Sequence, residues 1–166
     1  DKDKKELEKL LNDNSSDTDA IIDRFNKIRY NKGDITTGEI RIEMQKIMQQ
    51  KCSVFRNHDL ISEGIKEFEK IENSMNCINL NDKSLIFNTD LTETLELHNL
   101  MAQSKVTLYS ALNRTETRGA HAREDYKERD DTNWLVHSLS WLSNDGEVKL
   151  GNRPVHLNTL TNHIQP

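Results

Sequence analysis

Apolar residues recur every three or four positions through much of the chain, the spacing that places them on one face of an α-helix. The clearest stripe consists of Ile61, Ile65, Phe68, Ile71, Met75 and Ile78. Two shorter stripes precede it, one formed by Ile21, Ile22, Phe25 and Ile28 and the other by Ile40, Met44, Ile47 and Met48. This periodicity predicts three amphipathic helices in the first half of the chain.

A broader apolar face follows in the segment LTETLELHNLMAQSKVTLYSALNRT, which begins at residue 91. So wide a face is typical of a central helix that packs on several neighbours. Thr36 and Glu39 have the spacing of a helix-starting capping box, and Asp90 with Glu93 repeats that spacing. Gly33 follows the first stripe and predicts a helix stop.

Beyond Gly119 the helical spacing gives way to a charged loop and then to two partly alternating segments, 136–142 and 147–155. The Asp145-Gly146 pair between them supplies the positive φ angles that a tight hairpin needs. We therefore predict a mainly α fold, in which a bundle of three or more helices is followed by a charged loop and a small C-terminal β-hairpin.

The predicted domain organisation has one flexible or frayed N-terminal segment, 1–16, and one C-terminal helical domain, 17–166, whose first helix Ser16 or Asp17 would cap. Within it we expect the bundle over about 17–115, the loop over 116–133, and the hairpin and tail over 134–166. The chain begins at Asp1 without a methionine and stops at Pro166 in an unpatterned tail. We interpret this as a piece excised from a longer protein.

Charge and composition exclude several classes of function. The formal charge is -5 with acids and bases interspersed, which argues against a nucleic-acid partner. No apolar run approaches the roughly 20 residues that span a bilayer, so we expect a soluble domain without direct membrane insertion. Cys52 and Cys77 have no CxxC neighbour and are expected to be reduced, half-buried thiols.

The segment from Arg114 to Asp131 is the most unusual part of the chain, with four arginines among acidic residues. One hypothesis is an anion site, because guanidinium groups bind a dicarboxylate in forked geometry and His121 would exchange protons near neutral pH. The other is a network of ion pairs that pins the loop to the domain or to another domain. We favour the network, because the acids slightly outnumber the bases.

The remaining residues show no catalytic machinery. The other histidines lack the spacing of zinc ligands, and neither a GxSxG elbow nor a flanking motif for a cysteine nucleophile is present. The six glycines are scattered and form no GxGxxG turn. Trp134 and Trp141 are better explained by core or interface packing than by nucleobase stacking.

The chain nevertheless resembles a known family from about Asp17 to Leu160. Four segments occur in order and at the separations of the C-terminal region of succinate dehydrogenase flavoproteins: TGEIRIEMQKIMQQKCSVFR, NTDLTETLELHNLM, TETRGAHAREDYKERDDTNWLVHSLSW and VKLGNRPVHLNTL. The run from Arg118 to Asp125 matches the most distinctive sequence of the family. The family run begins Glu-Ser-Arg-Gly, whereas here Thr117 precedes Arg118.

The resemblance implies that the redox chemistry lies in absent parts of a parent enzyme, which oxidises succinate to fumarate and passes electrons through iron–sulfur centres to a quinone. In that family FAD is joined to a histidine of an N-terminal Rossmann-like domain, and the catalytic arginine and dicarboxylate ligands belong to that domain and an inserted capping domain. We therefore expect no catalytic, cofactor-binding or metal residues here, no cofactor in this fragment, FAD in the parent chain, and no activity from the fragment alone.

The resemblance further implies that the charged loop contacts the flavin-binding and capping domains of the parent chain or the iron–sulfur subunit. The predicted interface residues are Arg114, Glu116, Arg118, His121, Arg123, Glu124, Asp125, Arg129, Asp130 and Asp131. We expect the loop and tail, which lack an evident anchor, to be mobile in the isolated domain and ordered in the assembly. Replacing Arg118 or Arg123 by alanine should then disturb assembly more than folding.

Three alternatives remain at this stage: the equivalent domain of a fumarate reductase, that of an L-aspartate oxidase, and an unrelated helical interaction module. The long match through the hairpin favours succinate dehydrogenase. Its complex is expected on the cytoplasmic side of a bacterial inner membrane, held there by partner subunits, or on the matrix side in a mitochondrion.

Overall fold

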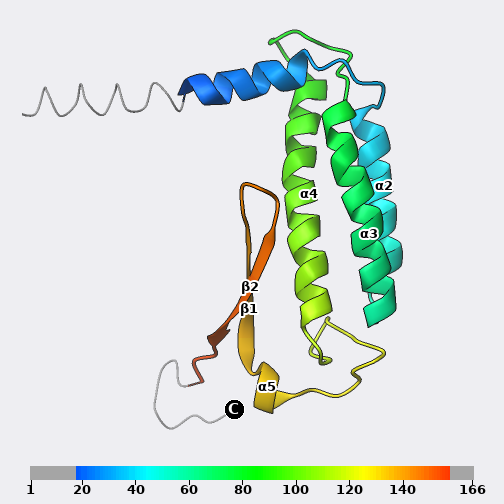
Figure 1. Cartoon of the computed structure of the whole chain (residues 1–166), viewed down its shortest axis with the longest axis vertical. Helices are drawn as coiled ribbons and strands as arrows, with labels where there is room; N and C mark the ends of the chain where they lie inside the picture. The colour runs from blue at the N-terminus through cyan, green and yellow to red at the C-terminus, as the bar shows by residue number, and fades with distance from the viewer. Residues whose placement is uncertain (1–17, 158–166) are drawn as a thin grey trace, which may run out of the picture. The chain divides into compact units, whose positions relative to one another are not determined.

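The computed structural model describes residues 18–157, so the predictions for residues 1–16, for the first helix cap and for the end of the tail lie outside it. Residues 18–29 are helical, and they precede α2 (Thr37–Lys51), α3 (His58–Ser74), a 3-10 turn (Met75–Cys77), α4 (Thr89–Asn113) and α5 (Asp131–Trp134). Strands β1 (Val136–Leu142) and β2 (Val148–Pro154) follow (Figure 1). The predicted mainly α fold with a C-terminal hairpin is confirmed.

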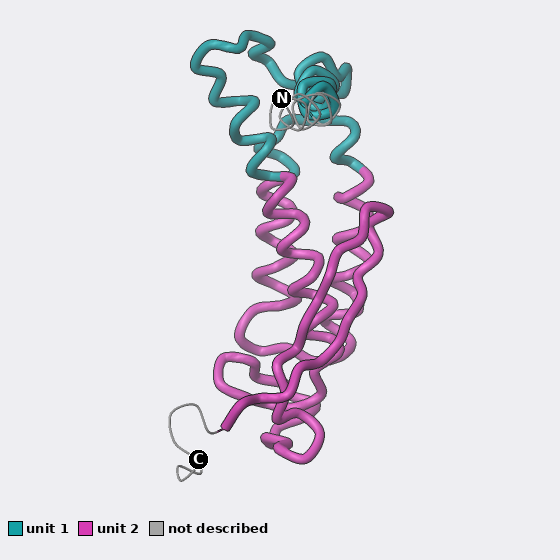
Figure 2. The backbone as a smooth tube through the Cα atoms, turned by 90° about the vertical axis from the view of Figure 1, so that its left-hand side faces the viewer, with its two compact units in different colours: residues 1–40, 74–97 teal, residues 41–73, 98–166 magenta. Residues whose placement is uncertain are grey.

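The chain divides into two compact units, which Figure 2 colours separately. Unit 1 comprises Asp1–Ile40 and Ser74–Leu97, and unit 2 comprises Arg41–Asn73 and His98–Pro166. Buried apolar side chains of unit 1 are Ile40, Ile78, Leu80, Leu91 and Leu97, and those of unit 2 include Met44, Ile47, Ile61, Ile65, Phe68, Met101, Leu108 and Ala111. Within residues 18–157, none of the helices combines the length and hydropathy needed to span a bilayer.

In unit 1, the predicted capping box at the start of α2 is confirmed. The Thr36 N–H donates to Glu39 Oε2 at 2.7 Å, and the Glu39 N–H donates to Thr36 Oγ1 at 3.3 Å. Two otherwise orphaned donors at the helix start are thereby paired. A buried contact between the Thr37 and Thr94 hydroxyls, 2.7 Å apart, then joins α2 to α4.

Gly33 has a different role from the predicted helix stop. A Cβ atom at this position would lie 1.6 Å from the Cys77 carbonyl oxygen, because two extended segments pair here. The Ile35 N–H donates to the Cys77 carbonyl at 3.2 Å, and the Asn79 N–H donates to the Ile35 carbonyl at 2.9 Å. Glycine is therefore required by the close approach of two backbones, and the positive-φ glycines of the described chain are Gly119 and Gly146 instead.

Two predicted helix limits were wrong. α3 ends at Ser74, so Ile78 is extended, although its side chain is buried as the apolar stripe predicts. α4 begins one residue before Asp90, and its cap is Asn88, whose Oδ1 accepts the Leu91 N–H at 2.7 Å. Asp90 instead accepts the Asn81 N–H at 2.7 Å, which fastens the preceding loop to the helix.

In unit 2, α2 and α3 approach each other closely at Gly64. A Cβ atom there would lie 2.6 Å from Lys51 Cβ, and the Lys51 ammonium pairs with Glu63 at 2.7 Å. Ile61 and Phe68, at 0% and 1% exposed, extend the packed face along α3. The apolar stripe of α3 thus forms much of the core that supports the charged loop.

The hairpin pairs β1 with β2 in antiparallel register, with Leu139 opposite Gly151. Its turn differs from the predicted one, because only Gly146 (φ 85°) has a positive φ and Asp145 does not. The Ser143 N–H donates to the Glu147 carbonyl and the Gly146 N–H to the Ser143 carbonyl, both at 3.0 Å. This is a three-residue loop closed by a glycine in the left-handed region.

The cysteines are free, as predicted, but neither is half-buried. Cys52 is 7% exposed, and burial raises the pKa of its thiol although Arg56 partly opposes this. Cys77 is exposed. A raised pKa keeps the Cys52 thiol protonated and therefore a poor nucleophile.

Candidate functional site

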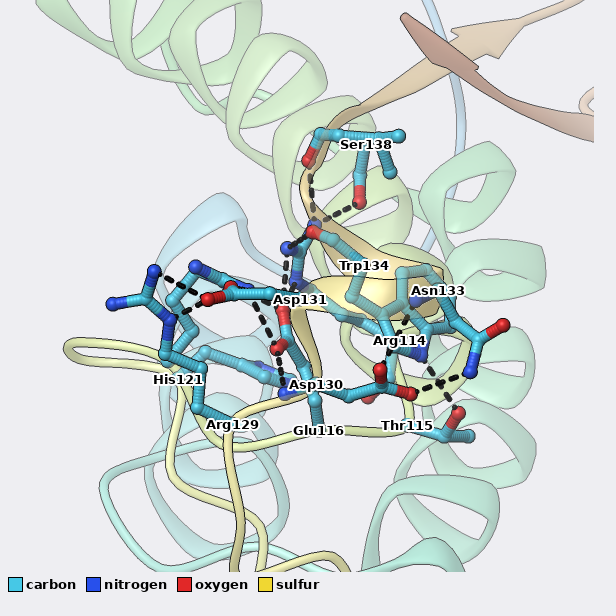
Figure 3. Close-up of polar contacts among 12 residues, drawn as sticks. Arg114, Thr115, Glu116, His121, Arg129, Asp130, Asp131, Asn133, Trp134 and Ser138 are labelled. Atoms are coloured by element: carbon cyan, nitrogen blue, oxygen red, sulfur yellow. Dashed lines mark hydrogen bonds and ion pairs between the residues drawn. The ribbon is translucent and has the colours of Figure 1, made fainter. Parts of the chain in front are cut away.

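The charged loop from Arg114 to Asp131 leaves the end of α4 and leads into α5 and β1, all within unit 2. Figure 3 shows the polar contacts around Glu116 together with those of Arg129, Asp130 and Asp131. The Glu116 side chain is 0% exposed and accepts hydrogen bonds from Arg114 Nε (2.8 Å), Arg118 Nε (2.8 Å) and the Asp130 N–H (2.9 Å). A buried carboxylate is thus fully partnered inside the loop.

The protonation of Glu116 follows from two opposed effects. Burial by itself raises the pKa of the carboxyl, but the hydrogen bonds from Arg118, the Asp130 N–H and Arg114 outweigh it and lower the pKa to about 2. Glu116 is therefore a carboxylate at neutral pH. It does not have the pKa of a general acid or base near pH 7.

Arg114 fastens the hairpin to the end of α4. Its Nε and Nη2 groups pair with Glu116, its Nη2 also donates to the Trp134 carbonyl (2.6 Å), and its Nη1 donates to the Val136 carbonyl (3.1 Å) and to Ser138 Oγ (2.9 Å). The guanidinium also lies over the Trp134 ring, 5.2 Å from its centroid. All of its N–H groups are therefore engaged by acceptors of this chain.

Arg123 binds the C-terminal end of α4. Its side chain is 0% exposed, and its Nη1 donates to the carbonyls of Ala111, Leu112 and Arg114 at 2.9 to 3.2 Å. Its other two nitrogens form a forked pair with Asp125 at 2.8 and 2.7 Å. A cation at a helix C-terminus pairs carbonyls that have no partner within the helix.

Asp125 binds the N-terminal end of α3, where it accepts the His58 N–H at 2.9 Å. The hydrogen bonds from Arg123 and His58 lower the pKa of Asp125 to about 2, although burial partly opposes them. The neighbouring Glu124 donates its backbone N–H to the Arg56 carbonyl at 2.9 Å. These contacts hold the middle of the loop against the segment that begins α3.

A two-residue turn connects Arg118 to His121. Each of these residues donates its N–H to the carbonyl of the other, at 2.9 and 3.0 Å, and Gly119 (φ 58°) takes the first central position. Thr117 closes the same loop, because its hydroxyl accepts the Arg123 N–H and lies 2.8 Å from the Tyr126 carbonyl. The hydroxyl at position 117 is a structural contact that the sequence comparison did not reveal.

His121 sits at the centre of the cationic groups. Its Nε2 lies 3.0 Å from the Arg114 carbonyl, and its Nδ1 lies 3.4 Å from Arg56 Nη1. Burial lowers the pKa of His121, the contact with the Arg114 carbonyl partly opposes this, and the charges of Arg56, Arg123 and Arg114 lower the pKa further. The contacts fit a neutral imidazole that donates from Nε2 and accepts at Nδ1.

The last part of the loop forms the start of α5. Asp130 caps this helix by accepting the Thr132 and Asn133 N–H groups at 3.0 Å. Asp131 pairs with Arg118 at 2.6 Å and with Arg129 at 2.7 Å, and these two hydrogen bonds lower its pKa to about 2. All ten predicted interface residues thus lie in one connected polar region of unit 2.

The contacts match the ion-pair network rather than a loop with unpaired arginines. The premise that nothing anchors the loop was wrong, because Glu116 and Arg123 are 0% and 2% exposed. Sequence reasoning missed these anchors because the partners of Arg123 include main-chain carbonyls, which carry no sequence signal. Whether the ten residues also contact other domains or subunits remains a prediction.

Arg56 is the site residue that sequence reasoning missed. Its Nε donates to the Ser53 carbonyl at 2.9 Å and its Nη1 contacts His121, but no carboxylate within residues 18–157 pairs with it. It lines an open groove of about 480 Å³ whose described lining contains no acidic residue: Arg56, Gln103, Val106, Thr107, Ser110, Ala111, Arg114, His121, Ser138 and Ser140. The groove lies between α4 and β1, and it combines two arginines and several hydroxyl side chains with apolar surface that includes Val106 and Ala111.

Comparison with known proteins agrees with this architecture. The family described as "Fumarate reductase flavoprotein C-term" matches residues 41–166. The chain belongs to the succinate dehydrogenase and fumarate reductase flavoprotein family. The succinate dehydrogenase flavoprotein subunit of Rickettsia bellii is 46% identical over 147 residues, a match that covers 89% of this chain and 25% of that protein.

Two further members are similar over most of the chain. The mitochondrial succinate dehydrogenase flavoprotein subunit of Oryza sativa subsp. japonica is 44% identical, with 85% of this chain and 22% of that protein covered. A solved chain of E. coli quinol fumarate reductase superposes with a TM-score of 0.84 at 30% identity, over 88% of this chain and 25% of that one. The chain therefore spans about a quarter of the length of the family members it matches.

Within residues 18–157, neither Gly33 nor Gly119 supplies the phosphate-binding turn that the flavin implied by the family name would need. Gly119 lies in a two-residue turn and Gly33 packs against a carbonyl, so neither belongs to a glycine-rich cradle at a helix start. Within the described residues, no group of three or more His, Cys, Asp or Glu side chains has the arrangement of a metal site. The arginines that resemble an anion site are engaged by Glu116, Asp125 and Asp131.

Proposed function

We propose that this chain is the C-terminal scaffold and interface domain of a succinate dehydrogenase flavoprotein. The parent enzyme oxidises succinate to fumarate with FAD and passes the electrons to iron–sulfur centres and a quinone. Support comes from the succinate dehydrogenase subunits of Rickettsia bellii and Oryza sativa, which are 46% and 44% identical to the chain. The fragment itself supplies no catalytic group in this proposal.

One observation carries the scaffold role: the arginines of the most distinctive segment are already engaged within the domain. Arg114 and Arg123 direct their N–H groups to acceptors of the chain, and Arg118 bridges Glu116 and Asp131. A dicarboxylate substrate would have to displace carboxylates that these guanidinium groups hold in a buried setting. The segment therefore serves to fix the loop, the hairpin and two helix ends in one arrangement.

The proposed partners are the flavin-binding and capping domains of the same parent chain and the iron–sulfur subunit. The groove beside Arg56 suits an acidic side chain from one of them, because Arg56 has no carboxylate partner within residues 18–157 and the described lining holds no acidic residue. The complex would lie on the cytoplasmic side of a bacterial inner membrane, or on the matrix side in a mitochondrion, held there through other subunits.

A fumarate reductase is the second candidate for the parent enzyme. The observation that favours it is the E. coli quinol fumarate reductase chain, with a TM-score of 0.84 over 88% of this chain. Its 30% identity is lower than that of the succinate dehydrogenase subunits, so we rank it second. The two candidates differ in the preferred direction of turnover between succinate and fumarate.

The test compares this chain with the full-length flavoprotein. Each purified protein is mixed with succinate and an artificial electron acceptor, and reduction of the acceptor is followed. We expect sustained turnover from the flavoprotein and none from the chain alone. Turnover by the chain, or a tightly bound flavin that colours it yellow, contradicts the scaffold proposal; a flavoprotein that reduces fumarate but does not oxidise succinate favours the second candidate.

A further inference from the structure

Three consecutive apolar side chains project into solvent from unit 1. Leu85, Ile86 and Phe87 are 71%, 77% and 97% exposed, and we call these three residues the apolar hook. They lie in the loop that leads into α4 (Figure 1). Single exposed apolar residues are ordinary on protein surfaces, but three in succession, with an almost fully exposed aromatic ring, mark an interaction surface.

The loop that carries the apolar hook is held firmly at its base. Arg29 donates from Nε to the Lys83 carbonyl at 3.1 Å, and Asn88 Nδ2 donates to the carbonyls of Asp82 and Ser84 at 2.8 and 2.9 Å. The Ser84 N–H donates to Asp82 Oδ1 at 2.8 Å. These side-chain bonds fix both ends of the hook, so little conformational freedom remains to be lost when it binds.

Phe87 also has a backbone conformation that disfavours its own side chain. Its φ is 50°, the only positive φ of a non-glycine residue in the described chain. This region costs free energy for residues with a Cβ atom, and bulky residues are rarely found there. The Phe87 ring is not buried within its own domain, so no packing in this chain offsets the strain. A partner that binds the ring would explain why the strained conformation is kept.

A hollow of about 430 Å³ lies beside the ring and completes the surface. Its lining includes Leu85, Phe87 and Leu91 together with Asn88, Thr89 and Thr92 at the start of α4. A protruding ring next to an apolar hollow offers both a knob and a hole to a complementary surface. Unit 1 also exposes Ile21, Ile22 and Phe25 on the helix over residues 18–29, at 54%, 49% and 36%.

We propose that the apolar hook docks on an apolar surface of the rest of the same polypeptide in the parent flavoprotein. This inference rests on the proposed function, because it needs a parent chain longer than this one. This chain matches about a quarter of the length of these family members. The remaining three quarters of such a parent chain would supply the surface on which the hook docks.

The size of the apolar hook favours this partner over a second copy or a separate subunit. Three side chains offer a few hundred Å² of apolar surface, less than the roughly 800 Å² per partner that a stable interface between separate proteins buries. A contact within one polypeptide needs less area, because the linked surfaces meet at a high effective concentration. The hook therefore suits docking between domains of one chain.

Hydroxyl-radical footprinting with mass spectrometry tests the proposal on unaltered residues. Oxidation of Leu85, Ile86 and Phe87 is compared in this chain, in the full-length flavoprotein, in the complete complex, and in the unfolded flavoprotein as a reference. We expect at least fivefold lower oxidation in the flavoprotein than in this chain. Protection that arises only when the iron–sulfur subunit is added overturns the proposal, and so does equal oxidation in the chain and the complex.

A substitution gives an independent reading, because its effects should have opposite signs. Phe87→Asn relieves the backbone strain, since asparagine tolerates positive φ, and removes the apolar ring. We expect the melting temperature of this chain to stay equal or rise, and that of the full-length flavoprotein to fall by about 3 °C or more. The control Phe87→Leu keeps an apolar side chain and should lower the melting temperature of the flavoprotein by less than half as much. An unchanged flavoprotein in both variants contradicts the proposal.

The outcome separates this inference from the proposed function. If the flavoprotein oxidises succinate but its apolar hook stays exposed, only the docking proposal fails. If the flavoprotein oxidises no succinate, the proposed function fails whatever the footprint of the hook.

Discussion

Arg123 and Asp125 form a forked ion pair in which each partner also holds the end of a different helix. Arg123 binds carbonyls at the C-terminus of α4, and Asp125 binds the first N–H of α3. Positive charge thus meets the negative end of one helix dipole, and negative charge meets the positive end of another. One pair of side chains ties the charged loop to both helices.

Replacing Arg123 by alanine should destabilise the chain strongly. The change leaves Asp125 without its partner, unpairs three carbonyls and opens a cavity where a fully buried side chain lay. We expect a loss of about 3 kcal/mol in the free energy of unfolding, measured by urea denaturation. Arg129→Ala is the control, because Arg129 is 60% exposed and its pair with Asp131 should contribute less than about 1 kcal/mol. The burial of Arg123 thereby reverses our expectation that alanine here disturbs assembly more than folding.

The stability of the chain should fall in acid because of Glu116. Its pKa is lowered from 4.5 to about 2 in the folded state, so the unfolded chain takes up the proton first as the pH falls. The stabilisation is complete above the ordinary pKa and is lost between about pH 5 and pH 2. Asp125 and Asp131, whose pKa values are also lowered to about 2, act in the same direction.

Glu116→Gln separates the contribution of this carboxylate. The variant should be less stable by about 3 kcal/mol at pH 7, because two arginines lose a buried anion, and its stability should fall less steeply in acid. Free energies of unfolding measured from pH 7 to pH 3 check both expectations. A variant with the same acid slope as the unaltered chain would show that Glu116 is not held as a carboxylate.

Two glycines of unit 1 should respond in opposite directions to the same change. In Gly33→Ala the new methyl group would overlap the Cys77 carbonyl, so the paired segments must separate, at a cost of about 2 kcal/mol or more. In Gly38→Ala the methyl group meets nothing within 4 Å, and alanine favours the helix by about 0.5 to 1 kcal/mol. Thermal unfolding of both variants provides the measurement, and equal shifts would contradict the close approach at Gly33.

Arg56→Gln tests whether the groove beside α4 is an interface. Within the described residues Arg56 has no carboxylate partner, so the isolated chain should lose only about 1 kcal/mol. The yield of assembled complex should fall several-fold if an acidic side chain of the parent enzyme occupies the groove. Arg153→Gln, at an exposed arginine of β2 outside the groove lining and outside the predicted interface, serves as the control. Normal assembly of the Arg56 variant would show that the groove is not part of the interface.

The sequence predicted the parts of the fold that local patterns of apolar and capping residues determine. The stripe from Ile61 to Phe68 is buried along α3, and Thr36 with Glu39 forms the expected capping box. The Asp-Gly turn marked the hairpin correctly, although only Gly146 has a positive φ. Periodicity and caps act over a few residues, so a single sequence displays them directly.

The parts that were missed depend on contacts between distant segments. Arg56 meets His121 across 65 positions, and Gly33 meets Cys77 through main-chain atoms. The cap of α4 was assigned to Asp90 because Asp90 and Glu93 have the spacing of a capping box, but Asn88 occupies the cap and Asp90 binds the preceding loop. The run of charged residues located the loop, but neither that run nor the family resemblance indicated that Glu116 and Arg123 are buried inside it.

The contacts of Arg114 limit how early the end of α4 can reach its final arrangement during synthesis. Arg114 is synthesised before the groups that it binds in α5 and β1, namely the carbonyls of Trp134 and Val136 and the hydroxyl of Ser138. In a nascent chain that ends before residue 138, the Arg114 guanidinium can already bind Glu116 but still lacks the Ser138 hydroxyl as an acceptor. The end of α4 can therefore reach its final arrangement only after the start of β1 has been synthesised.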